Sequence, residues 1–145
     1  MSNTQTTLAI VKPDAVAGHK VGAIIAHLER EGFAVRALRM VRLTRAEAAA
    51  FYAVHEGRPF YPELVAFMTS GPCVPLALER VDAVAHLRDV IGATDPAEAA
   101  PGTIRKLHAG SKGKNAIHAS DSPENAEREV AFFFTGSERA GLFGK

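Results

Sequence analysis

The sequence predicts a single α/β (α+β) domain of the ferredoxin-like sandwich type, and the order of its predicted elements is the main reason. Apolar β-prone segments and helical patterns follow one another as strand, helix, strand, helix pair, strand, helix, long loop, strand and helix. This order repeats a split β-α-β unit, which is the ferredoxin-like arrangement. The length of 145 residues fits one domain, 1–145, with a sizeable core.

Four short segments combine apolar and β-branched residues in the way that is typical of strands. They are residues 7–11, 33–43, 74–79 and a short segment around Ile117. The second segment alternates, with Val35 and Ala37 on one face and Arg36 on the other, so it predicts the longest strand. The tail 136–145 is too rich in glycine for regular structure.

Five segments show helical periodicity or the residues that begin and end helices. They run from Val21 to a C-terminal cap at Gly32, from Thr44 to about Tyr52, from about Tyr61 to Thr69, from a cap at Asp82 to Gly92, and from Pro123 onward. Thr44 and Glu47 are spaced as a capping box. Residues 93–113 show no periodicity, and a loop of that length is typical of a functional or disordered segment.

The composition excludes several classes of protein. A net charge of +1 argues against a dedicated nucleic-acid binder. The single Cys73 cannot form an internal disulfide, which favours a reducing compartment and excludes a zinc cluster. Residues 1–7 are polar, and no apolar run approaches the length that spans a membrane. These features predict a cytoplasmic enzyme.

One stretch, from Asn115 to Ser122, places a histidine at a position suited to phosphate binding. Ile117 lies between small residues and predicts a strand, whereas Ser122 followed by Pro123 predicts the start of a helix. His118 therefore lies between a basic glycine-rich loop and a helix N-terminus, whose partial positive charge attracts phosphate. Position alone does not decide its role, because a histidine is more often a surface or packing residue.

Two well-separated segments resemble the signature sequences of the nucleoside diphosphate kinases. They are Gly113-Lys114-Asn115-Ala116-Ile117-His118-Ala119-Ser120-Asp121-Ser122 and Leu8-Ala9-Ile10-Val11-Lys12-Pro13-Asp14. The resemblance extends over nearly the whole chain and includes its length. It implies a four-stranded antiparallel sheet covered by helices. It also implies a magnesium-dependent enzyme that moves the γ-phosphate of a nucleoside triphosphate, typically ATP, to a histidine and then to a nucleoside diphosphate, in a ping-pong mechanism.

The same resemblance assigns the site residues. His118 is expected to be the phosphorylated nucleophile, through Nδ1, and Glu129 to orient its ring through the other nitrogen. Tyr52 and Ser120 resemble the hydroxyl-bearing neighbours of that histidine. The residues expected to bind the nucleotide are Lys12, Arg88, Thr94, Arg105 and Asn115 for the phosphates and ribose, and Phe60 for the base. Asp121 is expected to assist the magnesium ion through water, while the nucleotide phosphates hold most of the metal.

These residue types suit the chemistry. Phosphoryl transfer needs positive charge around the phosphates and an uncharged nucleophile at neutral pH. An unperturbed imidazole, with a pKa near 6.5, is mostly neutral there. Arginine suits bidentate contact with phosphate, and lysine acts as a point charge.

Three positions depart from the family pattern. Lys114 stands where relatives usually have arginine, Ala119 stands where they have glycine, and the segment 106–110 differs from the commoner sequence. None of these replaces an expected functional residue. We expect slightly altered kinetics and retained activity.

The resemblance also implies a homo-oligomer, either a hexamer or a tetramer, built from a common dimer. Two other functions remain open. A nucleic-acid-binding module could use Arg105, Lys106, Lys112 and Lys114, but no strand carries the aromatic signature of RNA readers with this fold. A nucleotide-binding regulator could keep the pocket without turnover, although candidates stand at every catalytic position.

Overall fold

The computed structural model describes residues 3–136, and the predicted irregular tail lies, from residue 137 onward, outside the described residues. The elements in chain order are β1 (Thr4–Val11), α1 (Pro13–Ala17), α2 (Val21–Arg30), β2 (Ala34–Leu38), α3 (Arg45–Phe51), the 3₁₀ turn η1 (Ala53–His55), α4 (Tyr61–Met68), β3 (Val74–Val81), α5 (Ala83–Ile91), α6 (Ile104–His108), β4 (Ile117–Ala119) and α7 (Pro123–Phe133). No helix in this part of the chain is long and apolar enough to cross a membrane.

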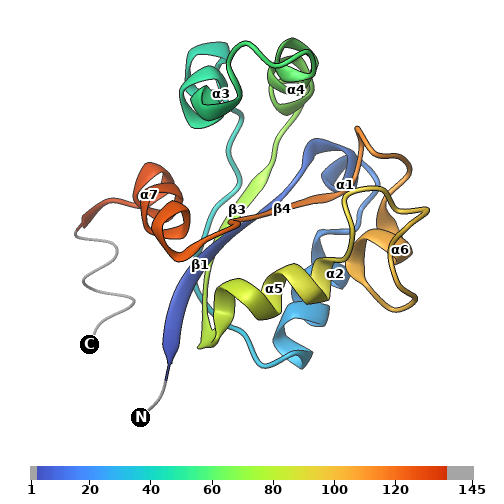
Figure 1. Ribbon diagram of the computed structural model, residues 1–145, viewed down its shortest axis with the longest axis vertical. Helices are drawn as coiled ribbons and strands as arrows, with labels where there is room; N and C mark the ends of the chain where they lie inside the picture. Colours follow the sequence, from blue (N-terminus) through green and yellow to red (C-terminus); the bar gives the residue numbers. More distant parts are fainter. Residues whose placement is uncertain (1–2, 137–145) are drawn as a thin grey trace.

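The four strands form one sheet in the order β2-β3-β1-β4, and all neighbours are antiparallel (Figure 1). β1 pairs with β3 along its whole length, from Thr4 opposite Val81 to Val11 opposite Val74. β4 adds three pairs on the other side of β1, with His118 opposite Ile10. This arrangement confirms the ferredoxin-like sandwich with a four-stranded antiparallel sheet.

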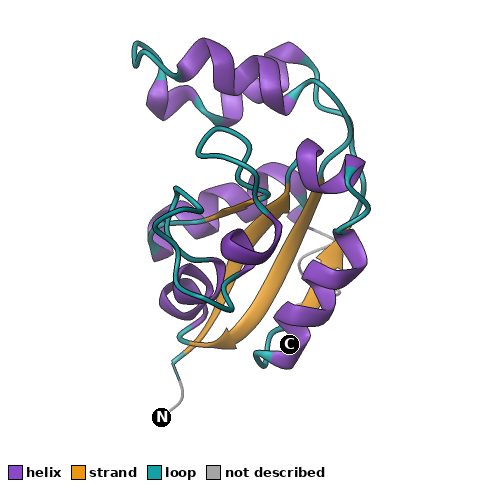
Figure 2. Ribbon diagram, turned by 90° about the vertical axis from the view of Figure 1, so that its right-hand side faces the viewer, coloured by secondary structure: helices purple, strands orange, loops and turns teal. Residues whose placement is uncertain are grey.

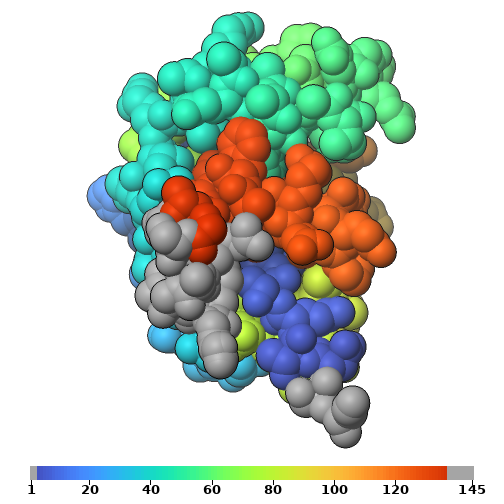
Figure 3. Space-filling model, turned by 90° about the vertical axis from the view of Figure 1, so that its left-hand side faces the viewer, coloured from blue at the N-terminus to red at the C-terminus, as the bar shows by residue number. Residues whose placement is uncertain are grey.

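The sheet separates two apolar cores because side chains alternate along each strand. Ala9 and Val11 point into a core that α2, α5 and α6 cover with residues such as Leu28, Leu87 and Ile104. Leu8 and Ile10 point into the opposite core, shared with α3, α4 and α7. Figure 2 shows the sheet between these helices, and Figure 3 shows α3 and α4, in teal to green, above the orange-to-red segment of α7.

The predicted helix ends are confirmed where the sequence carries the clearest capping residues. Thr44 and Glu47 form the predicted capping box, with each side chain accepting the other residue's backbone N–H. Ser122 Oγ accepts the N–H of Asn125 and begins α7, with Pro123 at its first position. Gly92 ends α5 with a φ of +89°.

The second strand is shorter than predicted, because it ends at Leu38 and not at residue 43. The N–H of Arg39 still donates to the carbonyl of Pro75, but proline has no N–H to donate in return. The ladder therefore stops, and only an isolated bridge between Val41 and Cys73 continues it.

Three short helical segments were not predicted, and one predicted cap is wrong. The segments α1, η1 and α6 have only three to five residues each, too few to show periodicity. Asp82 adopts a left-handed conformation with φ +53° and makes no side-chain cap. Its carboxylate binds the Asn3 side chain, while Gln5 Oε1 accepts the Val84 N–H.

Candidate active site

His118 is the middle residue of β4, so its side chain points to the face opposite that of its neighbours. Ile117 and Ala119 belong to the core under α2 and α5. The imidazole therefore faces α3 and α7. Phe51 and Tyr52 contact it edge-on, with ring centroids 5.5 and 6.2 Å away. Only 19% of the His118 side chain is exposed.

Glu129 fixes the orientation of this ring. It lies on the buried face of α7 with Ala126, Val130 and Phe133. Its Oε1 is 2.8 Å from His118 Nε2 and also accepts a 2.7 Å hydrogen bond from Ser120 Oγ. Burial works against the charge of Glu129, but these hydrogen bonds bring its pKa below the ordinary value. An ionised carboxylate can only accept, so Nε2 carries the proton and Nδ1 has the free lone pair.

The imidazole is held in its neutral form. Burial lowers the pKa of His118, the Glu129 carboxylate opposes this shift, and the charges of Lys12 and Arg105 reinforce it. Because the net shift is downward from 6.5, the ring is uncharged at neutral pH. The uncharged form is the one that can act as a nucleophile.

Lys12 provides a buried positive charge at the end of β1. Its Nζ donates a 2.9 Å hydrogen bond to Asn115 Oδ1, and Asn115 Nδ2 donates to the Thr94 carbonyl at 3.3 Å. Burial and, secondarily, the charge of Arg105 lower the pKa of Lys12 to about 8. The ammonium therefore remains mostly protonated at neutral pH, with little water around it.

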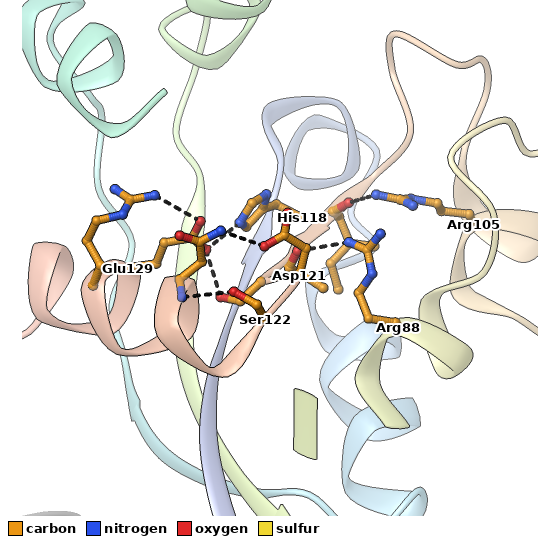
Figure 4. Close-up of polar contacts among 11 residues, drawn as sticks. Arg88, Arg105, His118, Asp121, Ser122 and Glu129 are labelled. Atoms are coloured by element: carbon orange, nitrogen blue, oxygen red, sulfur yellow. Dashed lines mark hydrogen bonds and ion pairs between the residues drawn. The ribbon is translucent and has the colours of Figure 1, made fainter. Parts of the chain in front are cut away.

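Two arginines complete this side of the site. Arg105, on α6, donates from Nη2 to the Ile117 carbonyl at 2.7 Å and from Nη1 to the Gly92 carbonyl at 3.1 Å. Arg88, on α5, donates to the Ala119 carbonyl at 3.2 Å. Burial, with the charge of Arg88, lowers the pKa of Arg105 to about 10, so it stays charged. Figure 4 shows Glu129 on one side of His118 and both arginines on the other.

A cavity of about 1040 Å³ brings these groups together, a volume suited to a nucleotide-sized ligand. Ten of the eleven residues that the sequence singles out line it: Lys12, Tyr52, Phe60, Arg88, Thr94, Arg105, Asn115, His118, Asp121 and Glu129. Ser120 does not line the cavity, because it is fully buried behind Glu129. Phe60 is 46% exposed, and Leu64 and Phe67 from the same segment also line the cavity.

The Tyr52 side chain is buried beside the imidazole. Burial, followed by the charges of Cys73 and Glu129, raises its pKa far above the ordinary value, so the hydroxyl keeps its proton. Among residues 3–136 the hydroxyl has no hydrogen-bond partner. It is therefore a buried, unpaired donor in a residue that lines the cavity.

Sequence reasoning missed several residues of the cavity wall. They include Phe51, His55 and Arg128, whereas Lys112, named above only for the nucleic-acid alternative, also lines the cavity. His55 packs against the rings of Tyr52 and Phe60, and Arg128 Nη2 lies 3.5 Å from Glu129 Oε2. Their spacing carries no signal that distinguishes them from ordinary core or surface residues.

The site offers few ligands of its own to a metal ion. In the described part of the chain, no three His, Cys, Asp or Glu residues are grouped so that they could hold one. Asp121 lines the cavity as an ionised carboxylate, since a hydrogen bond from Asn125 lowers its pKa despite some burial. This arrangement fits magnesium, which commonly keeps several waters and binds one carboxylate together with substrate phosphates.

Comparison with known proteins identifies relatives over almost the full length. The family model "Nucleoside diphosphate kinase" matches residues 5–139. A nucleoside diphosphate kinase of Sorangium cellulosum is 57% identical over 136 residues, covering 94% of each chain. That of Chlorobium chlorochromatii is 60% identical over 134 residues, covering 92% of this chain and 96% of the relative.

A solved structure gives the same result for the fold. The nucleoside diphosphate kinase of Aquifex aeolicus superposes with a TM-score of 0.92 at 50% identity. The match covers 93% of this chain and 98% of the other. The sheet, its helices and the placement of the segments around the cavity therefore follow a known architecture.

Proposed function

The chain belongs to the nucleoside diphosphate kinase family, and we propose that it transfers the γ-phosphate of a nucleoside triphosphate to a nucleoside diphosphate through a phosphohistidine at His118. The family and its named relatives make the chain a phosphotransferase of nucleotide metabolism. The covalent route and the roles of individual residues are our proposal. Its main support is the hydrogen bond from Nε2 to Glu129, which leaves Nδ1 free and unprotonated in a cavity that the buried Lys12 and Arg105 and the more exposed Arg88 also line.

The transfer consists of two displacements at one site. The Nδ1 lone pair attacks the γ-phosphorus, the bond from that phosphorus to the bridging oxygen breaks, and the nucleoside diphosphate leaves with the electron pair. A second diphosphate then attacks the phosphohistidine with a terminal oxygen, and the electron pair of the broken P–N bond returns to Nδ1. Lys12, Arg88 and Arg105 stabilise the charge that spreads over the phosphoryl oxygens. Thr94 and Asn115 orient the phosphates and ribose, and the Tyr52 hydroxyl and Ser120 support the histidine, Ser120 through Glu129.

Magnesium is the metal that we propose accompanies the nucleotide. It neutralises phosphate charge when it is bound. Asp121 would hold it through water, a role supported by an ionised carboxylate that lines the cavity. The nucleotide phosphates would supply its other ligands.

A coupled assay with ATP and a second nucleoside diphosphate tests this function. Formation of the second triphosphate supports it. Nucleotide binding without turnover would instead identify a regulator that has kept the pocket. Binding to nucleic acid through the cations around the cavity, without phosphoryl transfer, would favour the other alternative.

Replacing Glu129 by Gln should slow both half-reactions by roughly 10- to 100-fold without preventing phosphorylation. Phosphorylation at Nδ1 places positive charge on the ring, and the carboxylate stabilises that charge while it orients Nε2–H. Rapid-quench measurement of each half-reaction is the appropriate assay. Glu127→Gln, an exposed neighbour on the same helix, is the control and should change neither rate. A Glu129→Gln enzyme with unchanged rates would contradict the orienting role.

Discrimination among the four bases should be weak, below about 100-fold in kcat/KM. Phe60 offers an exposed ring in an apolar wall with Leu64 and Phe67, and stacking tolerates any base. Phe60→Ala should therefore weaken all four acceptor diphosphates by a similar factor, roughly 10-fold. Acceptor kinetics with adenine, guanine, cytosine and uracil diphosphates measure both effects. A loss confined to one base would mean that a polar group reads the base edge.

We propose, further, that residues 1–145 act as one domain, that the protein is cytoplasmic, and that it forms a hexamer or a tetramer built from dimers. The family match over residues 5–139 supports the single domain, and the single Cys73 supports a reducing compartment. The edge strand β2 supports assembly. Leu38, at its end, and the nearby Met40 are about half exposed, and an edge strand presents unpaired backbone groups.

A further inference from the structure

A strained turn lies directly before the strand that carries His118. Ala116 has a φ of +75°, in the left-handed region that residues with a Cβ seldom adopt. The N–H of Ile117 donates to the carbonyl of Asn115 at 2.9 Å, so the turn spans only three residues. A γ-turn with positive φ is rare and strained, and it persists only where its surroundings hold it.

The segment after β1 holds both backbone groups of Ala116. The N–H of Lys12 donates to the Ala116 carbonyl at 2.8 Å. The Ala116 N–H donates to Asp14 Oδ2 at 3.1 Å. The other oxygen, Oδ1, is buried and has no hydrogen-bond partner among residues 3–136, so the bond to Ala116 is what directs this carboxylate.

This turn joins several parts of the site. Asn115, on one side, is held between Lys12 and the Thr94 carbonyl. On the other side, the Ile117 carbonyl accepts a hydrogen bond from Arg105, and His118 is the next residue. β4 has only three residues, so its pairing with β1 gives it few contacts of its own. The backbone conformation at Ala116 therefore decides how Asn115 and His118 are presented to the same ligand.

We propose that Asp14 is a positioning residue for phosphoryl transfer, which acts by holding Ala116 in the left-handed turn that aims Asn115 and His118 into the cavity. The inference rests on the proposed function of this site. Asp14 touches neither the imidazole nor, in this arrangement, the space for the phosphates. This positioning effect passes through one backbone hydrogen bond, so an acceptor oxygen at this position is sufficient for it, whereas the Asp14 charge acts separately on Lys12.

Four variants separate this role from a general structural one. Asp14→Ala removes the acceptor, and the rate of His118 phosphorylation by ATP should fall by about 30-fold or more, because small misplacements of reacting groups are costly. Asp14→Asn keeps an acceptor and should stay within about threefold of wild type. In the Asp14→Ala background, Ala116→Gly should recover at least about fivefold, since glycine adopts positive φ without steric cost. His19→Gly, at a second non-glycine residue with positive φ that is exposed where Ala116 is buried, is the control and should recover nothing.

The rates are best measured near pH 6.5, well below the Lys12 pKa of about 8, because the Asp14 charge raises that pKa and its removal lowers it. An Asp14→Ala rate within about threefold of wild type overturns the proposal, as does equal recovery with Ala116→Gly and His19→Gly. If Asp14→Ala does not fold, Asp14→Asn and the double variant with Ala116→Gly decide. If both of these variants fold and are phosphorylated on His118 by ATP, the proposal is supported. If Asp14→Asn folds but is not phosphorylated, the proposal is contradicted.

Hydrogen exchange of the Ala116 amide keeps this inference separable from the proposed function. If wild-type protein acquires no phosphate from ATP, the phosphohistidine mechanism fails. The amide still reports on the turn in that case. Faster exchange in Asp14→Ala but not in Asp14→Asn supports the positioning role, and unchanged exchange in both variants overturns it.

Discussion

His118→Ala is expected to lower kcat for phosphoryl transfer by roughly 10⁴-fold or more. The imidazole is the only group in the described cavity that is neutral, oriented by a carboxylate through one nitrogen and open through the other. Alanine removes the nucleophile and leaves the cations in place. Nucleotide affinity should therefore change far less than turnover.

The coupled assay with ATP and a second diphosphate measures the turnover, and equilibrium titration with a diphosphate measures the affinity. His19→Ala, an exposed histidine outside the cavity, is the control and should retain full activity. Turnover of His118→Ala within about tenfold of wild type would mean that phosphate moves directly between nucleotides or through another residue.

Lys12→Met should lower kcat/KM by roughly 10²- to 10³-fold, the second largest effect expected. Lys12 is 7% exposed, and a buried cation stabilises developing phosphoryl charge far more than a solvated one. Methionine keeps much of the volume but removes the charge and the hydrogen bond to Asn115. Lys106→Met, an exposed lysine on α6 outside this cavity, is the control and should have little effect.

The pH dependence of Lys12 gives this prediction a second readout. Its pKa is lowered from 10.5 to about 8, so kcat/KM of the wild type should fall as the pH rises through about 8. The folded protein releases this proton before the unfolded chain does. The group therefore makes folding more favourable as the pH rises from about 8 towards 10.5, while activity declines. Both trends should disappear in Lys12→Met. If kcat/KM of this variant still declines at high pH, the decline belongs to the titration of another group.

The sequence predicts the fold well where the signals are local. The capping box at Thr44 and the helix start at Ser122 depend on residues within one turn, and both are present. The end of β2 depends on a partner far away in the chain, Pro75, whose missing N–H stops the ladder. The failed cap at Asp82 has a similar cause, because the side chain of Gln5 takes the backbone donor that the cap would have used.

The site is predictable to the extent that its residues match a known pattern. His118 and Glu129 lie eleven residues apart, and only the strand-to-helix turn between them brings them within 2.8 Å. The conformation of Ala116 has no sequence signal, since alanine ordinarily avoids positive φ. His55 likewise resembles any loop histidine until α3 and α4 place it against Phe60.

The phosphohistidine at His118 is tested most directly by incubating the protein with magnesium and ATP labelled in the γ-phosphate, without any acceptor. The label should bind to His118, withstand alkali and be lost in acid, and a second nucleoside diphosphate should remove it completely. Steady-state double-reciprocal plots should then give parallel lines. Absence of label on wild-type protein, or label that persists in His118→Ala, would contradict the mechanism.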